Sequence, residues 1–468
     1  MSGFFGSVLK SDCVSDVFYG TDYHSHLGTK RAGLAFYSPE LGFQRAIHSL
    51  EDGYFRNKFE NDYKDFIGRS GIGVISDTEA QPIVVTSHLG RFALATVGKM
   101  VNIDELEERY MLQHRTFSET SQGTVNATEL VAMLIAESKD FVSGIENVYE
   151  RVKGSCSMLV LTDNGIIAAR DKLGRTPVIL GKKNTGYAVT FETCAFPNLG
   201  YKTEYFLGPG EIVRITPDGY EQLRLPNEKM QICSFLWVYY GYPPSFYEGI
   251  NVDECRYRCG AALAKNDKVK ADFVAGIPDS GMGHAMGYSN EKKLPLKRPY
   301  SKYTPTWPRS FMPQSQEMRD LVAKMKLLPN ESVIADKSGI FLDDSIVRGT
   351  QLKDNVRDLY ASGMREVHMR IACPPLTYPC EFLNFSRSRS HLDLATHKAV
   401  KQLEGEENVD MNEYSDTSNG KYEAMIEQIR ENLGFTSLKY QKLHDLVDAI
   451  GLPKEKLCTH CWDGSSYF

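Results

Sequence analysis

One stretch of eleven residues, 340–350, constrains the fold of this chain more than any other. It runs Ile-Phe-Leu-Asp-Asp-Ser-Ile-Val-Arg-Gly-Thr, so an apolar run ends in two acids and a short loop that contains a glycine. Beyond the loop, the apolar residues Leu352, Val356 and Leu359 recur at helical spacing. The pattern predicts a strand at 339–342, a loop, and a helix at 351–360.

The chemistry of that loop favours a phosphate and a metal ion. A loop that opens a helix presents unpaired backbone N–H groups and the positive end of the helix dipole, so residues 345–350 can hold a phosphate. At the carboxyl end of the strand, Asp343 and Asp344 can accept two ribose hydroxyls or bind a hydrated Mg²⁺. A strand that ended in solvated acids would explain neither the pair of acids nor the Gly-Thr that follows them.

Composition places the chain among ordinary globular proteins. Its 468 residues suggest two or three domains, and its hydrophobic content of 42% and charged content of 24% are average. A net charge of −6 gives no electrostatic reason to expect a nucleic acid or a membrane as partner. The sequence shows neither a signal peptide nor an apolar run of ~18 residues, so we expect a cytoplasmic protein. Ten cysteines without a secretion signal indicate thiols or a metal centre rather than disulfides.

Two regions with different patterns of secondary structure are predicted. Up to about residue 225, apolar or alternating runs separated by Gly, Asn and Asp predict strands at 82–86, 156–162, 187–191 and 209–215, with one helix at 128–136. From about residue 230, helices and short strands alternate, which is typical of a parallel sheet wrapped by helices. The predicted order is helix 252–265, strand 272–276, a helix from about 316, strand 339–342, helix 351–360 and strand 366–372. Beyond about 395 the chain is charged and helical, with a polar loop at 412–419.

The loop at 343–350 resembles the 5-phosphoribosyl-1-pyrophosphate (PRPP) loop of type I phosphoribosyltransferases, and its sequence is similar to that of the glutamine PRPP amidotransferases. Further landmarks resemble that family in its own order: Ser2-Gly-Phe-Phe-Gly6, His26-Leu-Gly28, Ala32-Gly33, Arg170 to Pro177, Phe191-Glu-Thr-Cys194, Pro209-Gly-Glu211, Pro278-Asp-Ser-Gly281, Lys324-Met-Lys326, and Pro374-Pro375 with Cys380. The resemblance covers nearly the whole chain. It implies an α+β N-terminal-nucleophile glutaminase domain (αββα) at 2–228, an α/β type I phosphoribosyltransferase domain at 229–395, and a helical C-terminal tail at 396–468.

The resemblance also implies an activity. A pentosyltransferase of this family transfers an amino group to PRPP, giving 5-phosphoribosylamine and pyrophosphate, the first step of purine synthesis. Its partners would be PRPP, ammonia or glutamine, purine nucleotides as feedback ligands, and further copies of the chain in a homo-oligomer. Two alternatives stay open: a phosphoribosyltransferase with another amine acceptor, and a non-catalytic regulator that binds PRPP or nucleotides. The intact acid pair favours an enzyme.

A second loop, Ile277-Pro-Asp-Ser-Gly-Met-Gly283, follows the strand at 272–276. Loops that leave neighbouring strands of an open parallel sheet face one crevice, so pyrophosphate can lie between the two loops. Taken alone, this loop would be a plain turn. In the family the loop's serine and both acids of the PRPP loop contact Mg²⁺, which carries over to Ser280, Asp343 and Asp344. The predicted PRPP ligands are Asp279, Ser280, Gly281, Lys302, Arg309, Lys326, Asp343, Asp344, Ser345, Val347, Arg348, Gly349 and Thr350.

Lys302 and Arg309 belong to a basic and aromatic segment, 302–311, that lacks a helical or strand period. Such a segment is either a surface loop or a lid that closes over substrate and excludes water. Members of the family carry a flexible basic loop here, although the sequence at 304–307 departs from the family pattern.

The C-terminal Cys458-Thr-His-Cys461 is a two-thiolate unit that needs two further ligands. Taken alone, such a pair is more often a zinc site or two plain thiols. The resemblance supplies the partners, because Cys233 and Cys380 fall where one branch of the family places ligands of a [4Fe–4S] cluster. Such a cluster would fix the tail to the transferase domain. The remaining cysteines are expected to be plain and mostly buried thiols: Cys13, Cys156, Cys194, Cys255, Cys259 and Cys373.

The predicted glutaminase site departs from its family. Relatives expose an N-terminal Cys before Gly-x-Phe-Gly, whereas the matching residue here is Ser2, which removal of Met1 would leave as a hydroxyl nucleophile. The family's oxyanion-hole Asn corresponds to Val97, and its Asp for the glutamine amine corresponds to Ala127. The Arg that clamps the glutamine carboxylate would fall in 71–79, which is shortened and has no Arg. We therefore expect a folded but glutamine-inactive domain and a transferase that uses ammonia.

Overall fold

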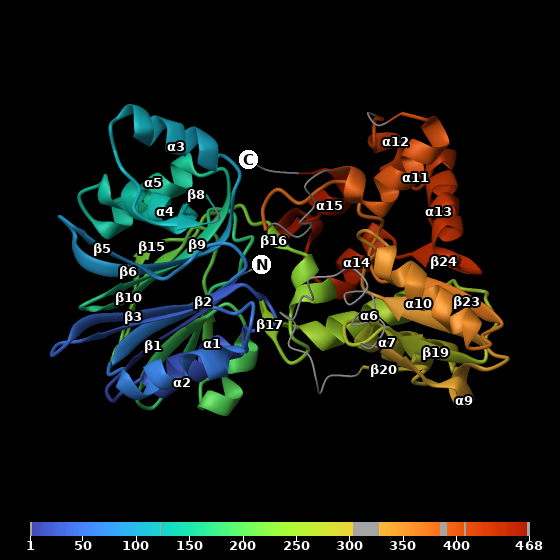
Figure 1. Cartoon of the computed structure of the whole chain (residues 1–468), viewed down its shortest axis with the longest axis horizontal. Coiled ribbons are helices and arrows are strands. Elements are labelled where there is room, and N and C mark those ends of the chain that lie inside the picture. Colours follow the sequence, from blue (N-terminus) through green and yellow to red (C-terminus); the bar gives the residue numbers. More distant parts are fainter. Residues whose placement is uncertain (1, 122, 303–326, 384–390, 407–408, 466–468) are drawn as a thin grey trace.

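The structure is a computed structural model that describes residues 2–121, 123–302, 327–383, 391–406 and 409–465. The chain forms two halves that lie side by side, a strand-rich N-terminal half and a C-terminal half in which helices surround a smaller sheet (Figure 1). In the described part of the chain, no helix combines the length and the apolar character that crossing a membrane requires.

The N-terminal half consists of two stacked sheets between helices (Figure 1). The first sheet, in the order β13-β11-β12-β1-β4-β2-β3, contains β1 (Gly3–Leu9), β2 (Arg31–Ser38), β3 (Gly42–Ser49), β4 (Ser70–Ser76), β11 (Ile179–Lys183), β12 (Gly186–Thr190) and β13 (Lys202–Phe206). The second, in the order β15-β14-β10-β9-β6-β5, contains β5 (Ile83–Ser87), β6 (Gly90–Met100), β9 (Gly154–Thr162), β10 (Gly165–Ala169), β14 (Ile212–Thr216) and β15 (Gly219–Arg224). Helices α1 (Val14–Asp22) and α2 (Phe55–Asp65) cover the first sheet, and α3 (Ile103–Leu112), α4 (Ala127–Ala136) and α5 (Phe141–Arg151) lie on the side of the second.

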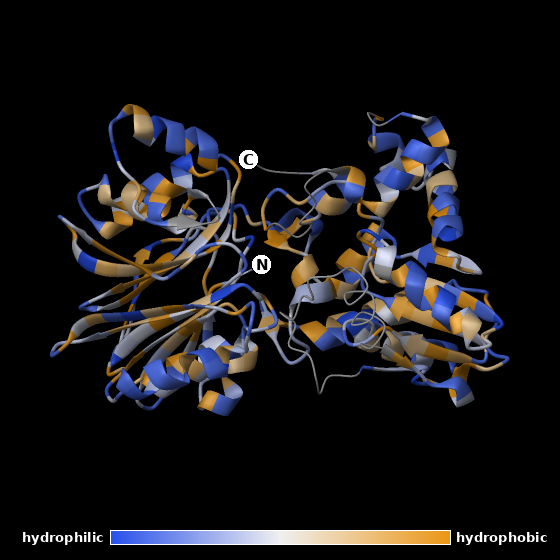
Figure 2. Ribbon diagram, in the orientation of Figure 1, coloured by the Kyte–Doolittle hydropathy of each residue, from blue (hydrophilic) through white to orange (hydrophobic). Residues whose placement is uncertain are grey.

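Burial explains why these strands show so little alternation. Every residue of β1 and β4 is buried, because each strand has the other sheet on one face and helices on the opposite face. Hydrophobic residues accordingly follow both sheets (Figure 2). Helix α4 begins where the Asn126 side chain accepts hydrogen bonds from the backbone N–H groups of Thr128 and Glu129.

The C-terminal half is built on a parallel sheet in the order β19-β22-β23-β24. Its strands are β19 (Phe273–Gly276), β22 (Ser338–Asp343), β23 (Glu366–Ile371) and β24 (Ser437–Tyr440), and its principal helices are α6 (Val252–Lys265), α7 (Gly281–Lys292) and α10 (Thr350–Ala361). Short elements complete this half: β16 (Ile232–Cys233), β17 (Phe246–Tyr247), β18 (Ile250–Asn251), β20 (Tyr300–Lys302), β21 (Leu327–Pro329) and α9 (Glu331–Ile334). In the N-terminal half, β7 (Thr120–Ser121) pairs with β8 (Thr124–Val125).

The C-terminal tail packs back onto both ends of this half. It contains α11 (Ala395–Glu404), α12 (Asn412–Ser415), α13 (Gly420–Leu433), α14 (Leu443–Ile450), β25 (Leu457–Cys458) and α15 (His460–Asp463). It also supplies β24 to the parallel sheet, and β25 pairs in parallel with β16. The residues near the C-terminus are therefore held beside the segment that enters the C-terminal half.

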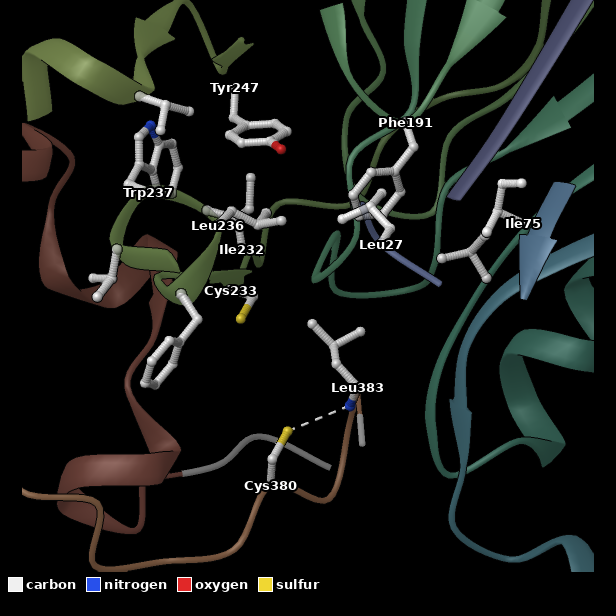
Figure 3. Close-up of a cluster of buried hydrophobic side chains, with 14 of the residues drawn as sticks. Leu27, Ile75, Phe191, Ile232, Cys233, Leu236, Trp237, Tyr247, Cys380 and Leu383 are labelled. Atoms are coloured by element: carbon white, nitrogen blue, oxygen red, sulfur yellow. Dashed lines mark hydrogen bonds between the residues drawn. The ribbon is translucent and has the colours of Figure 1, made fainter. Parts of the chain in front are cut away.

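Buried polar contacts join the two halves at Glu192, which follows β12. His26 Nε2 lies 2.8 Å from Glu192 Oε2, and the Tyr247 hydroxyl donates to Glu192 Oε1. Although burial alone would raise it, His26 and Tyr247 hold the pKa of the Glu192 carboxyl below its usual range. Figure 3 shows Tyr247 and Trp237 of one half facing Phe191 and Leu27 of the other.

The fold class predicted from the sequence is confirmed, and most predicted elements lie within three residues of the observed bounds. One prediction is wrong: the polar loop at 412–419 begins with the short helix α12. Asp410 accepts the backbone N–H of Asn412, and Tyr414, which is 1% exposed, anchors the turn and donates to Glu404. The helix expected from about residue 316 begins outside the described residues.

Candidate functional site

The two loops predicted to face one crevice lie against each other. Strands β19 and β22 are parallel neighbours, with Gly276 paired to Leu342, so residues 277–280 and 344–349 leave the same edge of the sheet. The Ser280 hydroxyl donates to Asp344 Oδ2, and the Ser345 hydroxyl donates to Asp344 Oδ1 at 2.5 Å. Asp344 therefore connects the loops.

The acid pair sits in a site that disfavours negative charge. Burial, followed by the charge of Asp344, raises the pKa of Asp343 well above its usual range. Burial also raises the pKa of Asp344, against the hydroxyls of Ser280 and Ser345 and the charge of Arg256. Asp344 is buried and Asp343 partly buried, and these two carboxylates with an adjacent hydroxyl are a suitable oxygen donor set for Mg²⁺, because a divalent cation would favour their ionised forms.

Arg256, which sequence reasoning missed, lies on α6 and is 3% exposed. Its guanidinium donates to the carbonyls of Trp237, Tyr239 and Gly241 at 2.8 to 2.9 Å. Because these acceptors are neutral, the positive charge remains to act on Asp344. Nothing in the sequence indicates that Arg256 lies near the acid pair, because α6 precedes these acids by nearly ninety residues.

The loop ends in a helix start that is open to an anion. Gly349 has a φ of +74° directly before α10, and no side chain caps the helix. A Cβ atom at Gly349 would lie 2.8 Å from Leu433 Cδ2 in a conformation that disfavours side chains. The neighbouring Val347 carbonyl accepts from Ala395 N at 2.8 Å, and Arg348 lies 3.5 Å from Asp393. The N–H groups at Thr350 and beyond can thus meet a phosphate.

The second loop is held equally closely. At Gly281, the first residue of α7, a Cβ atom would lie 2.3 Å from the Leu342 carbonyl oxygen, so only glycine permits this approach. Lys302 Nζ lies 2.5 Å from Asp279 Oδ2, which places this predicted phosphate ligand on the loop. Arg309 and Lys326 lie outside the described residues.

A cavity of about 210 Å³ lies in the N-terminal half. It is lined by Ser2, Asp77, Thr78, Glu79, Thr96, Val97, Gly98, Lys99, Met100, Ile103, Ala127, Ser155, Cys156 and Leu383. The residues that match the family's nucleophile, oxyanion-hole Asn and amine-binding Asp are therefore together: Ser2, Val97 and Ala127.

The lining of this cavity is acidic on the side where the family Arg was expected. Asp77 and Glu79, which sequence reasoning did not single out, line it beside one described cation, Lys99. Burial raises the pKa of the Glu79 carboxyl. Ser2 is 7% exposed, and its hydroxyl lies 3.4 Å from that of Ser76. The cavity thus offers a hydroxyl, two carboxylates and the apolar side chains of Val97 and Ala127.

Another cavity brings the four predicted cysteine ligands together. It is lined by Cys233, Cys380, Cys458 and Cys461, with Phe235, Phe382, Leu383, Trp462 and Arg175. Cys233 is paired with Cys458 across β16 and β25, and Cys380 Sγ accepts from Leu383 N at 3.4 Å. Figure 3 shows the sulfur atoms of Cys233 and Cys380 directed into the same gap. The six other cysteines are buried thiols without disulfide bonds, as predicted.

The four cysteines offer soft thiolate donors, which are ligands of zinc and of iron–sulfur clusters alike. Within the described residues, no group of three or more His, Cys, Asp or Glu side chains converges closely enough to hold one metal ion. Burial raises the pKa of the Cys233 and Cys458 thiols, so a metal centre would have to displace their protons.

Comparison with known proteins agrees with this arrangement. Residues 69–196 match the family profile described as "Glutamine amidotransferase domain". The amidophosphoribosyltransferase of Methanocaldococcus jannaschii is 30% identical over 99% of this chain and 97% of its own, and that of Bacillus subtilis is 29% identical over 96% and 89%. The solved glutamine PRPP amidotransferase from B. subtilis, complexed with ADP and GMP, covers 99% of this chain and 97% of its own with a TM-score of 0.83 at 28% identity.

Because relatedness at this level extends over both halves, the fold is that of an N-terminal glutamine amidotransferase domain followed by a phosphoribosyltransferase domain. The chain is an enzyme and belongs to the amidophosphoribosyltransferase family of pentosyltransferases.

Proposed function

We propose that this protein makes 5-phosphoribosylamine from PRPP and free ammonia. The observation that carries the proposal is the contact between Ser280 and Asp344 beside Asp343, at the edge where two neighbouring strands release their loops. In the reaction the ammonia nitrogen forms a bond to C1 of the ribose while the C1–oxygen bond to pyrophosphate breaks. Pyrophosphate leaves with the bonding electrons, and the new amine loses a proton.

The residues have distinct parts in this proposal. The N–H groups at the start of α10 hold the 5-phosphate, and Ser280, Asp343 and Asp344 hold Mg²⁺. When bound, Mg²⁺ neutralises the charge that develops on the leaving pyrophosphate. Lys302, next to Asp279, adds positive charge on the pyrophosphate side. Gly281 and Gly349 allow the backbone to approach closely enough for N–H groups to contact phosphate oxygens.

Ammonia rather than glutamine is proposed as the donor because of the N-terminal cavity. Val97 cannot donate a hydrogen bond from its side chain to an oxyanion, and the loss of one such donor costs roughly 10²–10³ in rate. Ala127 offers no carboxylate to the glutamine amine. Asp77 and Glu79 would repel the glutamine carboxylate, with only Lys99 among the described lining residues to offset them.

The test compares nitrogen donors in one assay of pyrophosphate release from PRPP. Ammonium should support turnover and glutamine should not, and Ser2→Ala should leave the ammonium rate unchanged. Glutamine-dependent turnover that disappears in Ser2→Ala would restore an ordinary serine glutaminase. Turnover with another amine but not with ammonium would identify a different acceptor, and PRPP binding without turnover would identify a regulator.

We further propose that Cys233, Cys380, Cys458 and Cys461 bind a [4Fe–4S] cluster. Their convergence on one buried cavity supports it, as does the soft thiolate donor set. Anaerobically purified protein should be brown and contain about four iron atoms per chain. Cys380→Ser should lose iron, whereas Cys13→Ser, at a buried cysteine before α1, should retain it. Zinc or no metal in the wild type would contradict this proposal.

Similarity to the same relatives also leads us to propose feedback regulation by nucleotides and assembly into a homo-oligomer. Purine nucleotides are proposed feedback ligands because the B. subtilis structure contains ADP and GMP. Titration of GMP into the pyrophosphate assay tests this, with inhibition expected at saturation. A homo-oligomer is expected from the resemblance, and light scattering measures it.

A further inference from the structure

We propose that Arg175 is the positioning residue of the cysteine site: its guanidinium supplies the positive charge that offsets a bound iron–sulfur cluster, and its contacts fix two ligand segments to the N-terminal half. The inference rests on the cluster proposed above. It assigns a role to a side chain from outside the ligand set and from the other half of the molecule.

Arg175 lies in the loop between β10 and β11, and it is 2% exposed. Its carbonyl oxygen accepts the backbone N–H of Cys233 at 3.1 Å, so Arg175 holds the segment that contains the first of the four cysteine ligands. Its guanidinium carbon lies 3.7 Å from the centre of the Phe382 ring, two residues after Cys380. One side chain of the N-terminal half therefore contacts the segments of two ligands.

The charge of Arg175 is directed at the cavity. Burial of a guanidinium is costly unless a negative charge offsets it. Its hydrogen bonds to the Gly154 carbonyl and to Gln231 Oε1, both 3.2 Å long, are with neutral groups. The third ligand thiol, Cys458, lines the same cavity as Arg175. Four thiolates around an iron–sulfur core would carry a net negative charge, and a buried guanidinium that lines the same cavity would offset it.

A functional consequence follows for the cluster. Reduction adds one more negative charge, so a buried neighbouring cation stabilises the reduced state more than the oxidised state. Arg175 should therefore raise the reduction potential of the cluster. The same attraction should also hold the Cys458 thiolate in place and slow the loss of iron.

The loop keeps its shape without the guanidinium, which makes the idea testable by substitution. The Asp171 carboxylate accepts the backbone N–H of Arg175 at 3.1 Å and that of Thr176 at 2.9 Å. Arg175→Gln keeps a hydrogen-bond donor of shorter reach but removes the charge, whereas Arg175→Lys keeps the charge and removes the planar contact with Phe382. Arg214→Gln, at a surface ion pair with Glu221 in the same half, is the control.

The experiment measures iron content and the midpoint potential of the anaerobic wild type and the three variants, by redox titration followed spectroscopically. Arg175→Gln should shift the equilibrium between oxidised and reduced cluster at least tenfold toward the oxidised form, which is about 59 mV for a one-electron couple. Arg175→Lys should restore most of the shift, and Arg214→Gln should match the wild type. If Arg175→Gln fails to retain iron, retention in Arg175→Lys supports the role of charge, and loss in both overturns it.

The outcomes separate this inference from the cluster proposal. A wild type without iron removes the cluster and this inference with it. A wild type with about four irons whose potential is unchanged in Arg175→Gln leaves the cluster in place and overturns the role of Arg175.

Discussion

Asp343→Asn should stabilise the protein in the absence of Mg²⁺ while abolishing its turnover. Asp343 Oδ1 accepts the backbone N–H of Asp344 at 2.9 Å, a bond that an Asn oxygen can also accept. The substitution therefore removes the charge and leaves the local hydrogen bond. It relieves both the burial of a carboxylate and its repulsion by Asp344, which together raise the pKa of Asp343.

The sign of the effect follows from linkage. A carboxyl whose pKa in the folded protein is raised stabilises the fold most at low pH, and this stability is lost as the pH rises through the folded pKa. At pH 7 to 8, the wild type without metal has lost the stability that protonated Asp343 contributes. The Asp343→Asn variant has no carboxyl at this position and does not lose it. Each unit of such a shift corresponds to about 1.36 kcal/mol. A gain of about 1 kcal/mol raises the melting temperature by about 2–4 °C in a domain of 150–250 residues.

The assay combines thermal unfolding at pH 5 and pH 8, with and without Mg²⁺ plus PRPP, and pyrophosphate release. Asp343→Asn should melt higher than the wild type at pH 8 without ligand, and this advantage should shrink at pH 5. Mg²⁺ with PRPP should stabilise the wild type and not the variant, and turnover should fall by on the order of 10² or more. Asp336→Asn, at a side chain that is 93% exposed in the same half, should change neither quantity. An unchanged or lower melting temperature at pH 8, or wild-type turnover, would refute the reasoning.

Two further predictions concern the backbone and the core of the C-terminal half. Gly349→Ala should raise KM for PRPP about tenfold, because a left-handed φ costs an alanine about 1–2 kcal/mol and its Cβ would contact Leu433. The control is Gly405→Ala, at a glycine with φ +76° and open space around it, which should leave KM unchanged. Equal effects of the two substitutions would contradict a role of Gly349 in phosphate binding. Asp267→Asn should remove an acid-sensitive part of stability. Burial alone would raise the pKa of Asp267, but Arg370 and Tyr288 lower it from 3.8 to about 2, so the stability is present above pH 4 and lost as the pH falls toward 2. Urea unfolding should show a loss of at least about 2 kcal/mol at pH 7 and a flatter profile between pH 4 and pH 2, and a wild-type profile in the variant would contradict the assignment.

Local pattern was enough to predict the elements that carry the transferase loops. Helix α6 was predicted at its observed bounds, and β22 and α10 within a residue of theirs, because each has a clear apolar period between turn signals. The proximity of Ser280 and Asp344 followed from one topological rule, since consecutive parallel strands release their loops at the same edge. Short-range pattern and sheet topology together placed these residues.

The charges that complete each site could not be predicted in this way. The charge of Arg256 acts on Asp344 from α6, which precedes the first strand of the parallel sheet in the chain. Arg175 lines the cysteine cavity from the other half of the molecule. The acids at Asp77 and Glu79 had no periodic signal, because they follow β4 in a loop whose direction depends on the packed sheets. Helix α12 was missed because a buried Tyr414, not its propensity, fixes it.

The contacts between the halves explain how the N-terminal domain can change its chemistry and keep its fold. Val97 and Ala127 face the cavity, so their side chains determine what binds there. Arg170 instead pairs with Glu248 at 2.8 Å, Glu192 receives Tyr247, and Arg175 supports Cys233, so each of them holds the C-terminal half. Leu383 lines both the N-terminal cavity and the cysteine cavity, three residues after Cys380. If the proposed loss of glutamine chemistry is correct, changes at Val97 and Ala127 would leave Arg170, Glu192 and Arg175 under constraint, because the C-terminal half packs against these three residues.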